Sequence, residues 1–319
     1  MRKVPETKRY LALTDHLSGR YGVKVFKIAL DAGFTCPNRD GTKGTGGCRF
    51  CSARGSGDFA GDRSLPLSAQ FEERLAAMRR KWPAGRFLVY LQAFTNTYAA
   101  PERLRALYEE ALSLHPDIVG LNVATRPDCV GDDVVAVLSA IAAKTDLTVE
   151  LGLQTIHPET AAAMNLGYGV DDFDDAVRRL RAASIPVVAH VIDGLPGETP
   201  EMMLTTIRHV AEIGVEGVKI HMLHVMRGTE LGRRYEDRPF PLLSLPEYVG
   251  IVCDQLELLP PETVIHRVTG DAPGEALIAP EWTKRKFVVQ NEIDRELRRR
   301  GVRQGERRRP GPAVEKRVP

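Results

Sequence analysis

Short apolar runs rich in β-branched residues alternate along the chain with segments of helical period. The composition and length of these runs predict six β-strands. They lie at residues 25–30, 87–94, 117–125, 147–154, 186–195 and 217–225. Between them, apolar residues recur on one helical face, for example at Phe71, Leu75, Met78 and Trp82. Because parallel neighbours need a long return path that a helix supplies compactly, the alternation predicts a parallel sheet.

Polar residues follow most of the predicted strands at their carboxyl ends. These clusters occupy residues 92–96, 125–126, 150–154, 190–193 and 221–224. A barrel gathers all its strand ends around one mouth, whereas an open sheet uses mainly the ends beside its switch point. We therefore expect an α/β fold built on a partial (β/α)6 barrel of the TIM type, with the functional site at its mouth.

The pattern changes after residue 228, where prolines interrupt the chain. A helix is expected at residues 248–259, a short strand at 264–268 and a final helix at 283–300 with Phe287, Ile293 and Leu297 as its apolar positions. We expect three parts in all. They are a core over residues 1–227 with the cysteine loop at 33–58, a small C-terminal α/β appendage over 228–300, and a disordered basic tail over 301–319.

Length and composition are those of an ordinary folded chain. Of the 319 residues, 43% are hydrophobic and 27% are charged, enough to bury a large core without help from a disulfide or a metal. No stretch approaches the roughly 18 apolar residues that span a bilayer, and the first residues lack the apolar centre of a signal peptide. We expect a cytoplasmic protein with no membrane partner, in which any metal serves chemistry.

Positive charge is concentrated at the C-terminus. Residues 298–319 carry nine Arg or Lys and two Glu, a net charge of +7, whereas the whole chain carries +2 and its remainder about −5. A tail of this kind is either solvated and disordered or an electrostatic arm for RNA. Both interpretations stay open.

Three of the five cysteines lie on one glycine-rich loop after the first predicted strand. Cys36, Cys48 and Cys51 fall within TCPNRDGTKGTGGCRFC at residues 35–51, a spacing unsuited to a secreted disulfide framework. Glycines let a backbone wrap closely around one metal centre. A structural zinc site needs four protein ligands, and neither His nor Cys occurs between Cys51 and His115.

Two interpretations of this loop remain. A [4Fe–4S] cluster held by three cysteines keeps one iron open for a small ligand, which suits catalysis. Alternatively, Cys36 is a buried core thiol, and Cys48 and Cys51 form a redox pair or half of a zinc site with distant partners.

The loop and its surroundings resemble the radical S-adenosylmethionine (SAM) superfamily. The gap between its first two cysteines is longer than in the usual Cys-x3-Cys-x2-Cys spacing but similar to that of the Elongator catalytic subunit, and Phe50 before the last cysteine is typical of the superfamily. The segments TRPD, ELGLQT, AH with LP, and RGT look like the Elongator radical domain in the same order. They lie at residues 125–128, 150–155, 189–190 with 195–196, and 227–229.

Nearly the whole chain is also similar to the bacterial family typified by YhcC and YtqA. QAFTNTY at 92–98, HRVTGDAP at 266–273 and IAPEW at 278–282 carry this resemblance with the cysteine loop. It implies a radical SAM enzyme, in which one electron passes through a [4Fe–4S] cluster to SAM and releases a 5′-deoxyadenosyl radical. It also implies tRNA as a partner, an electron donor such as flavodoxin or ferredoxin, and conversion of 5-carboxymethylaminomethyl uridine at the wobble position to 5-aminomethyl uridine.

The resemblance and the expected barrel mouth together suggest site residues. The cluster ligands are Cys36, Cys48 and Cys51. Residues expected to bind the cofactor are Phe50, Gln92, Thr95, Asn96, Thr125, Arg126, Glu150, Gln154, His190, Asp193 and His224. Cys129 is the candidate catalytic residue, as a radical-quenching thiol or a nucleophile, and its alternative is a buried small residue.

Several of these assignments have a structural alternative. Glu150 and Gln154 lie four residues apart on one strand and point to the same face, where they hold the cofactor or belong to a polar network. Arg126 either pairs with the methionine carboxylate or clamps Asp128. Histidines on strands are also common as satisfied core residues.

Two rival functions stay open at the level of the whole chain. A radical SAM enzyme acting on a small molecule would show no affinity for RNA. A non-catalytic, zinc-containing RNA-binding protein would carry zinc and no iron.

Overall fold

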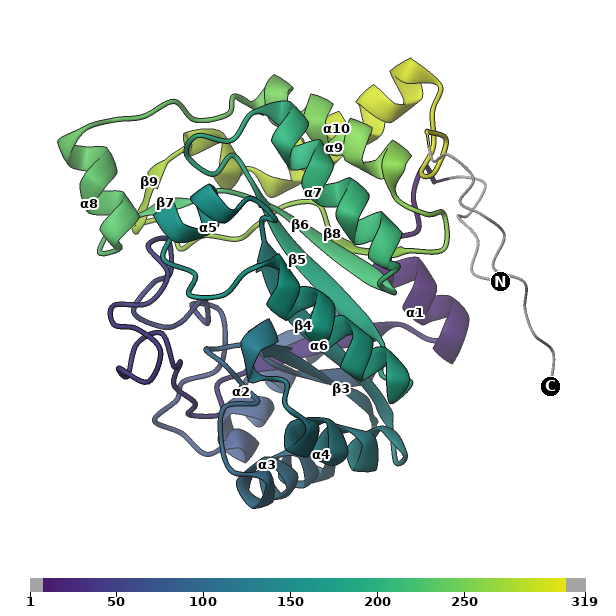
Figure 1. The fold of residues 1–319 in the computed structure, drawn as a ribbon. Helices are drawn as coiled ribbons and strands as arrows, with labels where there is room; N and C mark the ends of the chain where they lie inside the picture. The colour runs from purple at the N-terminus through teal and green to yellow at the C-terminus, as the bar shows by residue number, and fades with distance from the viewer. Residues whose placement is uncertain (1–7, 308–319) are drawn as a thin grey trace.

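A seven-stranded parallel sheet forms the centre of the molecule. The computed structural model describes residues 8–307, and the strands follow the order β1-β2-β3-β4-β5-β6-β8. Their bounds are β1 Val25–Leu30, β2 Arg86–Leu91, β3 Ile118–Thr125, β4 Asp146–Gln154, β5 Val187–Asp193, β6 Gly217–Met222 and β8 Val264–Arg267. The sheet curls into a half-barrel (Figure 1), which confirms the expected α/β fold of a partial TIM-type barrel.

Helices connect the strands and cover the outside of the sheet (Figure 1). They are α1 Leu13–Tyr21, α2 Leu67–Arg79, α3 Pro101–Ser113, α4 Asp132–Ala142, α5 Pro158–Ala163, α6 Val170–Ala182, α7 Pro200–Ile213, α8 Glu230–Asp237, α9 Leu245–Leu258 and α10 Lys286–Arg300. Two 3₁₀ helices, η1 Pro127–Cys129 and η2 Glu281–Lys284, and a small antiparallel pair, β7 Val225–Met226 and β9 Leu277–Ala279, complete the fold. No helix within residues 8–307 is long and apolar enough to cross a membrane.

The two faces of the sheet differ in polarity, as β4 illustrates. Leu147, Val149 and Leu151 are buried in the hydrophobic core. Glu150 and Gln154, at the alternate positions, line a cavity inside the half-barrel. Because side chains alternate across a strand, β4 supplies both an apolar outer face and a polar interior.

The sheet contains one strand more than the six predicted. β8 pairs in parallel with β6, where Gly217 lies opposite Val264 and Val218 opposite Ile265. The sequence pattern placed this strand in the C-terminal appendage. The chain returns through α8 and α9 before entering the sheet, so part of the segment after residue 228 extends the barrel through β8.

Three strands end earlier than predicted. β2 ends at Leu91, β5 at Asp193 and β6 at Met222. The residues that follow leave the sheet for loops, where the side-chain amide of Asn96, for example, donates to the carbonyl group of Ala93 at 3.1 Å. Apolar composition therefore marked the strands well but overestimated their length at the barrel mouth.

Two aromatic residues that the helical pattern placed on apolar faces are exposed. α2 ends before Trp82, which is 47% exposed. Phe287, in the first turn of α10, is 71% exposed, and the buried face of that helix consists of Val289, Ile293 and Leu297. The four-residue spacing of these three residues sets the buried face and leaves Phe287 off it.

The first part of the expected disordered tail packs on the fold. Gln304 accepts a hydrogen bond from the backbone N–H of Leu11 and donates to the carbonyl groups of Pro260 and Thr263. Arg307 adds ion pairs to acidic residues of α9. Residues 308–319, the rest of that tail, lie outside the described residues.

Candidate active site

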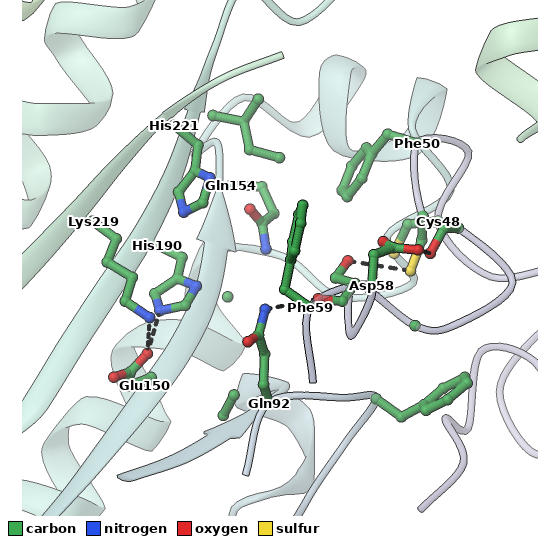
Figure 2. Close-up of a pocket in the computed structure, with 18 of the residues that line it drawn as sticks. Cys48, Phe50, Asp58, Phe59, Gln92, Glu150, Gln154, His190, Lys219 and His221 are labelled. Atoms are coloured by element: carbon green, nitrogen blue, oxygen red, sulfur yellow. Dashed lines mark hydrogen bonds and ion pairs between the residues drawn. The ribbon is translucent and has the colours of Figure 1, made fainter. Parts of the chain in front are cut away.

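A large cavity opens at the carboxyl ends of the strands. Its volume is about 490 Å³, within the range of small-molecule sites. The cysteine loop forms one side of the cavity and the interior of the half-barrel forms the other (Figure 2). All three loop cysteines line it, together with nine residues expected at the cofactor: Phe50, Gln92, Thr95, Thr125, Arg126, Glu150, Gln154, His190 and His224.

Hydrogen bonds from two of its own side chains fix the cysteine loop. The Arg39 guanidinium group donates to the carbonyl groups of Cys51 and Ser52, at 3.2 and 2.6 Å. The Asn38 amide donates to the carbonyl group of Asn165 at 2.6 Å, which ties the loop to the segment after α5. These contacts hold the loop in place at the edge of the cavity.

Gly47 is required where the loop passes Arg39. Its φ of 78° lies in the left-handed region that favours glycine, and a Cβ at this position would lie 2.7 Å from Arg39 Nε. Gly46 has a similar φ of 79° but no atom within 4 Å of a Cβ built there. The loop conformation therefore needs glycine at both positions, and at Gly47 close packing adds a second reason.

Burial makes the Cys48 thiol a poor anion by itself. It raises the pKa of the Cys48 thiol to about 12, and Cys51 adds to the rise. Arg126 opposes this shift, and its Nη1 lies 4.0 Å from Cys36 Sγ. Buried thiolates need compensating positive charge, which the irons of a cluster supply to their ligands. Three thiols around one cavity therefore fit a cluster with one open iron.

The same donor set does not resemble a mononuclear site. Within residues 8–307, no three His, Cys, Asp or Glu side chains form a group that could hold a single metal ion. In a cubane each cysteine binds a different iron, so its ligands need not converge on one point.

Polar groups beside the loop face the cavity with few protein partners. The hydroxyl oxygen of Thr95 is buried and has no hydrogen-bond partner among the described residues. The Gln92 amide donates to the carbonyl group of Ser56 at 2.9 Å. Gln154, at the end of β4, has a left-handed φ of 67° and lines the cavity (Figure 2). Because buried polar groups are normally paired, Thr95 marks a place for a polar ligand.

Arg126 joins three segments around the loop. Its Nε and Nη2 form a fork on the Asp128 carboxylate at 2.9 and 2.8 Å, and Lys43 of the loop pairs with the same carboxylate at 2.7 Å. Its Nη1 donates to the carbonyl group of Leu166 at 2.9 Å. In these contacts Arg126 clamps Asp128, which is the structural alternative to pairing with the methionine carboxylate.

Three expected site residues are not part of the cavity lining. The Asn96 amide is occupied by backbone carbonyl groups around the end of β2. Asp193 lies on the helix side of β5, where the amide of Gln255 donates to it at 2.7 Å. Cys129 lies in η1 beside Asp128, and burial raises its pKa to about 12. The structure therefore places these three side chains outside the cavity lining.

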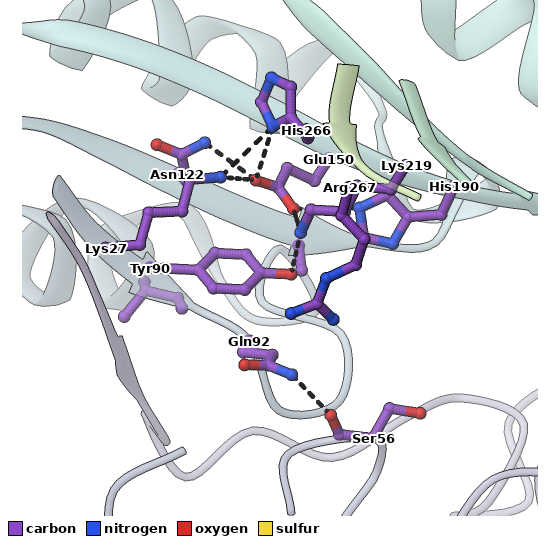
Figure 3. A network of polar contacts seen from close by, with 12 residues as sticks. Lys27, Ser56, Tyr90, Gln92, Asn122, Glu150, His190, Lys219, His266 and Arg267 are labelled. Carbon is purple, nitrogen blue, oxygen red and sulfur yellow. Dashed lines mark hydrogen bonds and ion pairs between the residues drawn. The ribbon is translucent and has the colours of Figure 1, made fainter. Parts of the chain in front are cut away.

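A layer of polar side chains crosses the interior of the half-barrel, and we call it the barrel floor (Figure 3). Each strand of the sheet supplies one member: Lys27, Tyr90, Asn122, Glu150, His190, Lys219 and His266. Glu150 is at its centre. Lys27 Nζ lies 2.5 Å from one carboxylate oxygen, which also accepts from Asn122 at 2.9 Å. The other oxygen contacts His190 at 3.0 Å and forms an ion pair with Lys219.

Burial and charge oppose each other in the barrel floor. Burial favours the neutral form of Glu150, but Lys219 and Lys27 hold its pKa well below the usual range. Burial lowers the pKa of Lys219 to about 7 against the attraction of Glu150. Burial and Lys219 together lower the pKa of His190 to about 4. The layer thus keeps an ionised carboxylate among cations and neutral imidazoles.

The sequence pattern did not single out most of the barrel floor. These residues could have been found from the alternation of side chains, which has a period of two along each strand. Tyr90 lies two residues before Gln92, and Lys219 two residues before His221, so alternation places both on the interior face. Extending each polar cluster backwards along its strand would have found them.

Comparison with known proteins establishes the family. Residues 38–210 match the Radical SAM superfamily, and residues 215–299 match the Radical_SAM C-terminal domain. The chain belongs to the radical SAM superfamily. It is therefore a radical SAM enzyme, which confirms the resemblance of its cysteine loop and sets aside the non-catalytic zinc alternative.

Two similar proteins cover nearly the whole chain, and a third covers about half of it. Uncharacterized protein YtqA of Bacillus subtilis is 49% identical over 298 residues, which are 93% of this chain and 92% of that protein. Protein YhcC of Escherichia coli is 37% identical over 90% of this chain and 91% of that protein. A tRNA uridine(34) acetyltransferase of Dehalococcoides mccartyi is 30% identical over 49% of this chain and 34% of that protein.

A solved structure supports the fold of this radical SAM enzyme. The archaeal Methanocaldococcus infernus Elp3 aligns with a TM-score of 0.67 at 17% identity, over 88% of this chain and 64% of that chain. Membership of the superfamily implies a [4Fe–4S] cluster and SAM, and the three loop thiols and the unpaired Thr95 hydroxyl fit such ligands.

Proposed function

We propose that Cys36, Cys48 and Cys51 hold a [4Fe–4S] cluster and that SAM binds between the cysteine loop and the barrel interior. The observation that carries this proposal is that three thiols of one loop open onto the same cavity as the polar ends of the strands. When bound, the reduced cluster supplies the electron that cleaves SAM to a 5′-deoxyadenosyl radical. A flavodoxin or ferredoxin is the proposed source of that electron.

In this proposal, side chains of the protein bind and orient SAM and shield the reaction space from water. Thr95, Gln92 and Gln154 offer hydrogen bonds to the polar groups of SAM. Phe50 and Leu223 line the same cavity and pack together in an apolar cluster. Their apolar surface excludes water from the space where a radical would react.

The substrate we propose is tRNA with 5-carboxymethylaminomethyl uridine at the wobble position, which becomes 5-aminomethyl uridine. The N–CH2 carbon of the carboxymethyl unit would lose two electrons, taken up as SAM is cleaved to methionine and 5′-deoxyadenosine, and water would hydrolyse the resulting imine to the amine and glyoxylate. Similarity to a tRNA uridine(34) acetyltransferase and to Elongator complex protein 3 of Saccharomyces cerevisiae, 28% identical over 49% of this chain, supports a tRNA uridine. Phe59 is 45% exposed and lines the cavity. An aromatic ring in this position can stack on an unpaired base of an anticodon loop.

The first test is radical chemistry. The protein is purified without oxygen, reconstituted with iron and sulfide, reduced and assayed for 5′-deoxyadenosine from SAM. We expect product from the wild type, none from Cys48→Ala, and nearly normal product from the matched control Cys129→Ala. Wild-type protein that carries a full cluster and yields no product would overturn the proposal. Loss of product in Cys129→Ala would return that thiol to the site.

The second test concerns the substrate. Nucleosides of tRNA from cells with and without the gene are compared by mass spectrometry. We expect the 5-carboxymethylaminomethyl form to accumulate at the wobble position without the gene. An unchanged wobble uridine would favour the small-molecule alternative.

A further inference from the structure

An arginine at the edge of the barrel floor has no part in the function proposed above. Arg267 ends β8 and lines the cavity, with 35% of its side chain exposed. Its guanidinium group donates one hydrogen bond within residues 8–307, from Nη2 to Asp271 at 3.1 Å. The other nitrogens, Nε and Nη1, have no hydrogen-bond partner there, so part of the guanidinium fork remains available to a ligand.

The surroundings of Arg267 contain more positive than negative charge. The two lysines of the barrel floor share one carboxylate, that of Glu150. Asp271, the partner of Arg267, is also shared, because Lys286 pairs with it at 2.7 Å. Four basic side chains, Lys27, Lys219, Arg267 and Lys286, thus share two carboxylates. A further anion would reduce this excess of positive charge.

Two imidazoles beside Arg267 are consistent with this excess of cations. Burial and the charge of Arg267 hold the pKa of His221 well below its usual range. Burial lowers the pKa of His224 to about 4 against the attraction of Asp271. His224 Nε2 is buried without a hydrogen-bond partner among the described residues. A neutral imidazole still donates one N–H, so hydrogen-bond donors are present as well as charge.

We propose that Arg267, together with His221 and His224, binds a carboxylate carried by the substrate. This inference rests on the proposed function, in which the substituent on the uridine ends in a carboxylate. A guanidinium fork matches the planar geometry of a carboxylate. The cysteine loop and the barrel floor lie on opposite sides of the cavity (Figure 2). The substituent therefore extends towards the floor, and its C–H bonds lie between the anchored carboxylate and the loop.

Binding measurements with matched RNAs test this assignment. The probes are synthetic anticodon stem-loops that carry 5-carboxymethylaminomethyl uridine, its methyl ester, or unmodified uridine. They are titrated into the reconstituted holoenzyme with SAM and without reductant. Esterification removes the negative charge of the substituent and leaves every RNA phosphate in place. We expect the wild type to bind the acid about 10- to 100-fold more tightly than the ester, as for a charge-assisted hydrogen bond.

Variants test whether Arg267 causes the preference for the acid over the ester. Arg267→Gln is expected to bind the acid as weakly as the ester, while its affinity for the ester stays that of the wild type. Arg267→Lys keeps part of the preference because it keeps the charge. Arg295→Gln is the matched control, since Arg295 pairs with Glu292 on the exposed side of α10. Folding of Arg267→Gln is checked by thermal unfolding, and Asp271 keeps Lys286 as its partner in that variant.

The contrary outcomes separate this inference from the proposed function. Equal binding of acid and ester by a wild type that cleaves SAM overturns the carboxylate site alone. A loss of SAM affinity in Arg267→Gln assigns the anion to the cofactor, and an equal loss with all three RNAs assigns it to phosphate; either result overturns the inference. Failure of all three RNAs to bind overturns the tRNA proposal and this inference together.

Discussion

The cysteine loop and the barrel floor face each other across one cavity, but they achieve their electrostatics in opposite ways. The loop gathers three thiols, and the raised pKa of Cys48 shows that the protein does not balance a negative charge on that thiol. In the barrel floor, Glu150 is balanced by Lys27 and Lys219 within the chain itself. The loop therefore needs a cofactor to balance its charge. The floor balances the charge of Glu150 with its own lysines and carries an excess of positive charge.

The loop and the barrel floor are therefore expected to contribute differently to the stability of the protein. Removal of a cysteine ligand from the loop takes away one small side chain and leaves no charge without a partner. Removal of the central carboxylate from the floor leaves buried cations without a counter-charge, which costs far more than an ion pair is worth at the surface. We expect the floor to control folding and the loop to control cofactor binding.

The largest effect is expected from Glu150→Gln. This change leaves the buried Lys219 and the partly buried Lys27 around a neutral amide. It should lower the free energy of unfolding by about 3–5 kcal/mol, the usual cost of breaking a buried pair. Denaturant unfolding of the protein without its cofactors measures it. Cys48→Ala in the same assay should change the free energy of unfolding by about 1 kcal/mol or less.

A double variant checks the cause. Lys219→Met in the Glu150→Gln background removes one of the uncompensated cations and should recover part of the lost stability, because the effects of coupled charges are not additive. If the double variant were instead less stable by the sum of the two single changes, the charge balance would not explain the role of Glu150, and the contrast with the loop would fail.

The two regions also differ in how far they could be predicted from the sequence. The cysteine loop is continuous, so its residues, its glycines and its family resemblance could be recognised together. The barrel floor takes one residue from each of seven strands, and β8 was not expected in the sheet at all. His266 therefore had no predicted neighbour. Asp193 shows the converse error, since its position at a strand end was predicted correctly but its side chain belongs to the opposite face.

An intermediate effect is expected from glycine substitutions in the loop. Gly47→Ala adds a clash with Arg39 to a left-handed backbone, whereas Gly46→Ala adds only the backbone cost. We expect about 1 kcal/mol of local destabilisation for Gly46→Ala and about 2–3 kcal/mol for Gly47→Ala. Iron bound per chain after reconstitution, and its rate of release to a chelator, measure the difference.

The glycine pair also probes where stability resides. Both variants should unfold in denaturant much like the wild type when no cofactor is bound, because the loop lies outside the main core. Equal iron retention by the two variants would show that the contact with Arg39 does not shape the loop. A large loss of global stability in either would show that the loop, like the floor, supports the fold.

The smallest effect concerns two buried carboxylates on neighbouring strands. Glu150, on the interior face of β4, has a lowered pKa because cations surround it. Asp193, on the outer face of β5, has no such cations, and burial raises its pKa from 3.8 to about 7. The same kind of group is therefore ionised on one side of the sheet and protonated on the other at slightly acidic pH.

Asp193→Asn should therefore change how stability depends on pH. Between pH 4 and 7 the folded wild type holds a proton on Asp193 that the unfolded chain releases, so its stability falls as the pH rises through this window. The asparagine has no such proton and can still accept the hydrogen bond from Gln255. The variant should gain stability relative to the wild type between pH 4 and 7, by up to about 1.4 kcal/mol for each pH unit, and nothing more above it. A difference that is constant with pH would show that Asp193 is ionised in the folded protein. Buried carboxylates would then be ionised on both faces of the sheet.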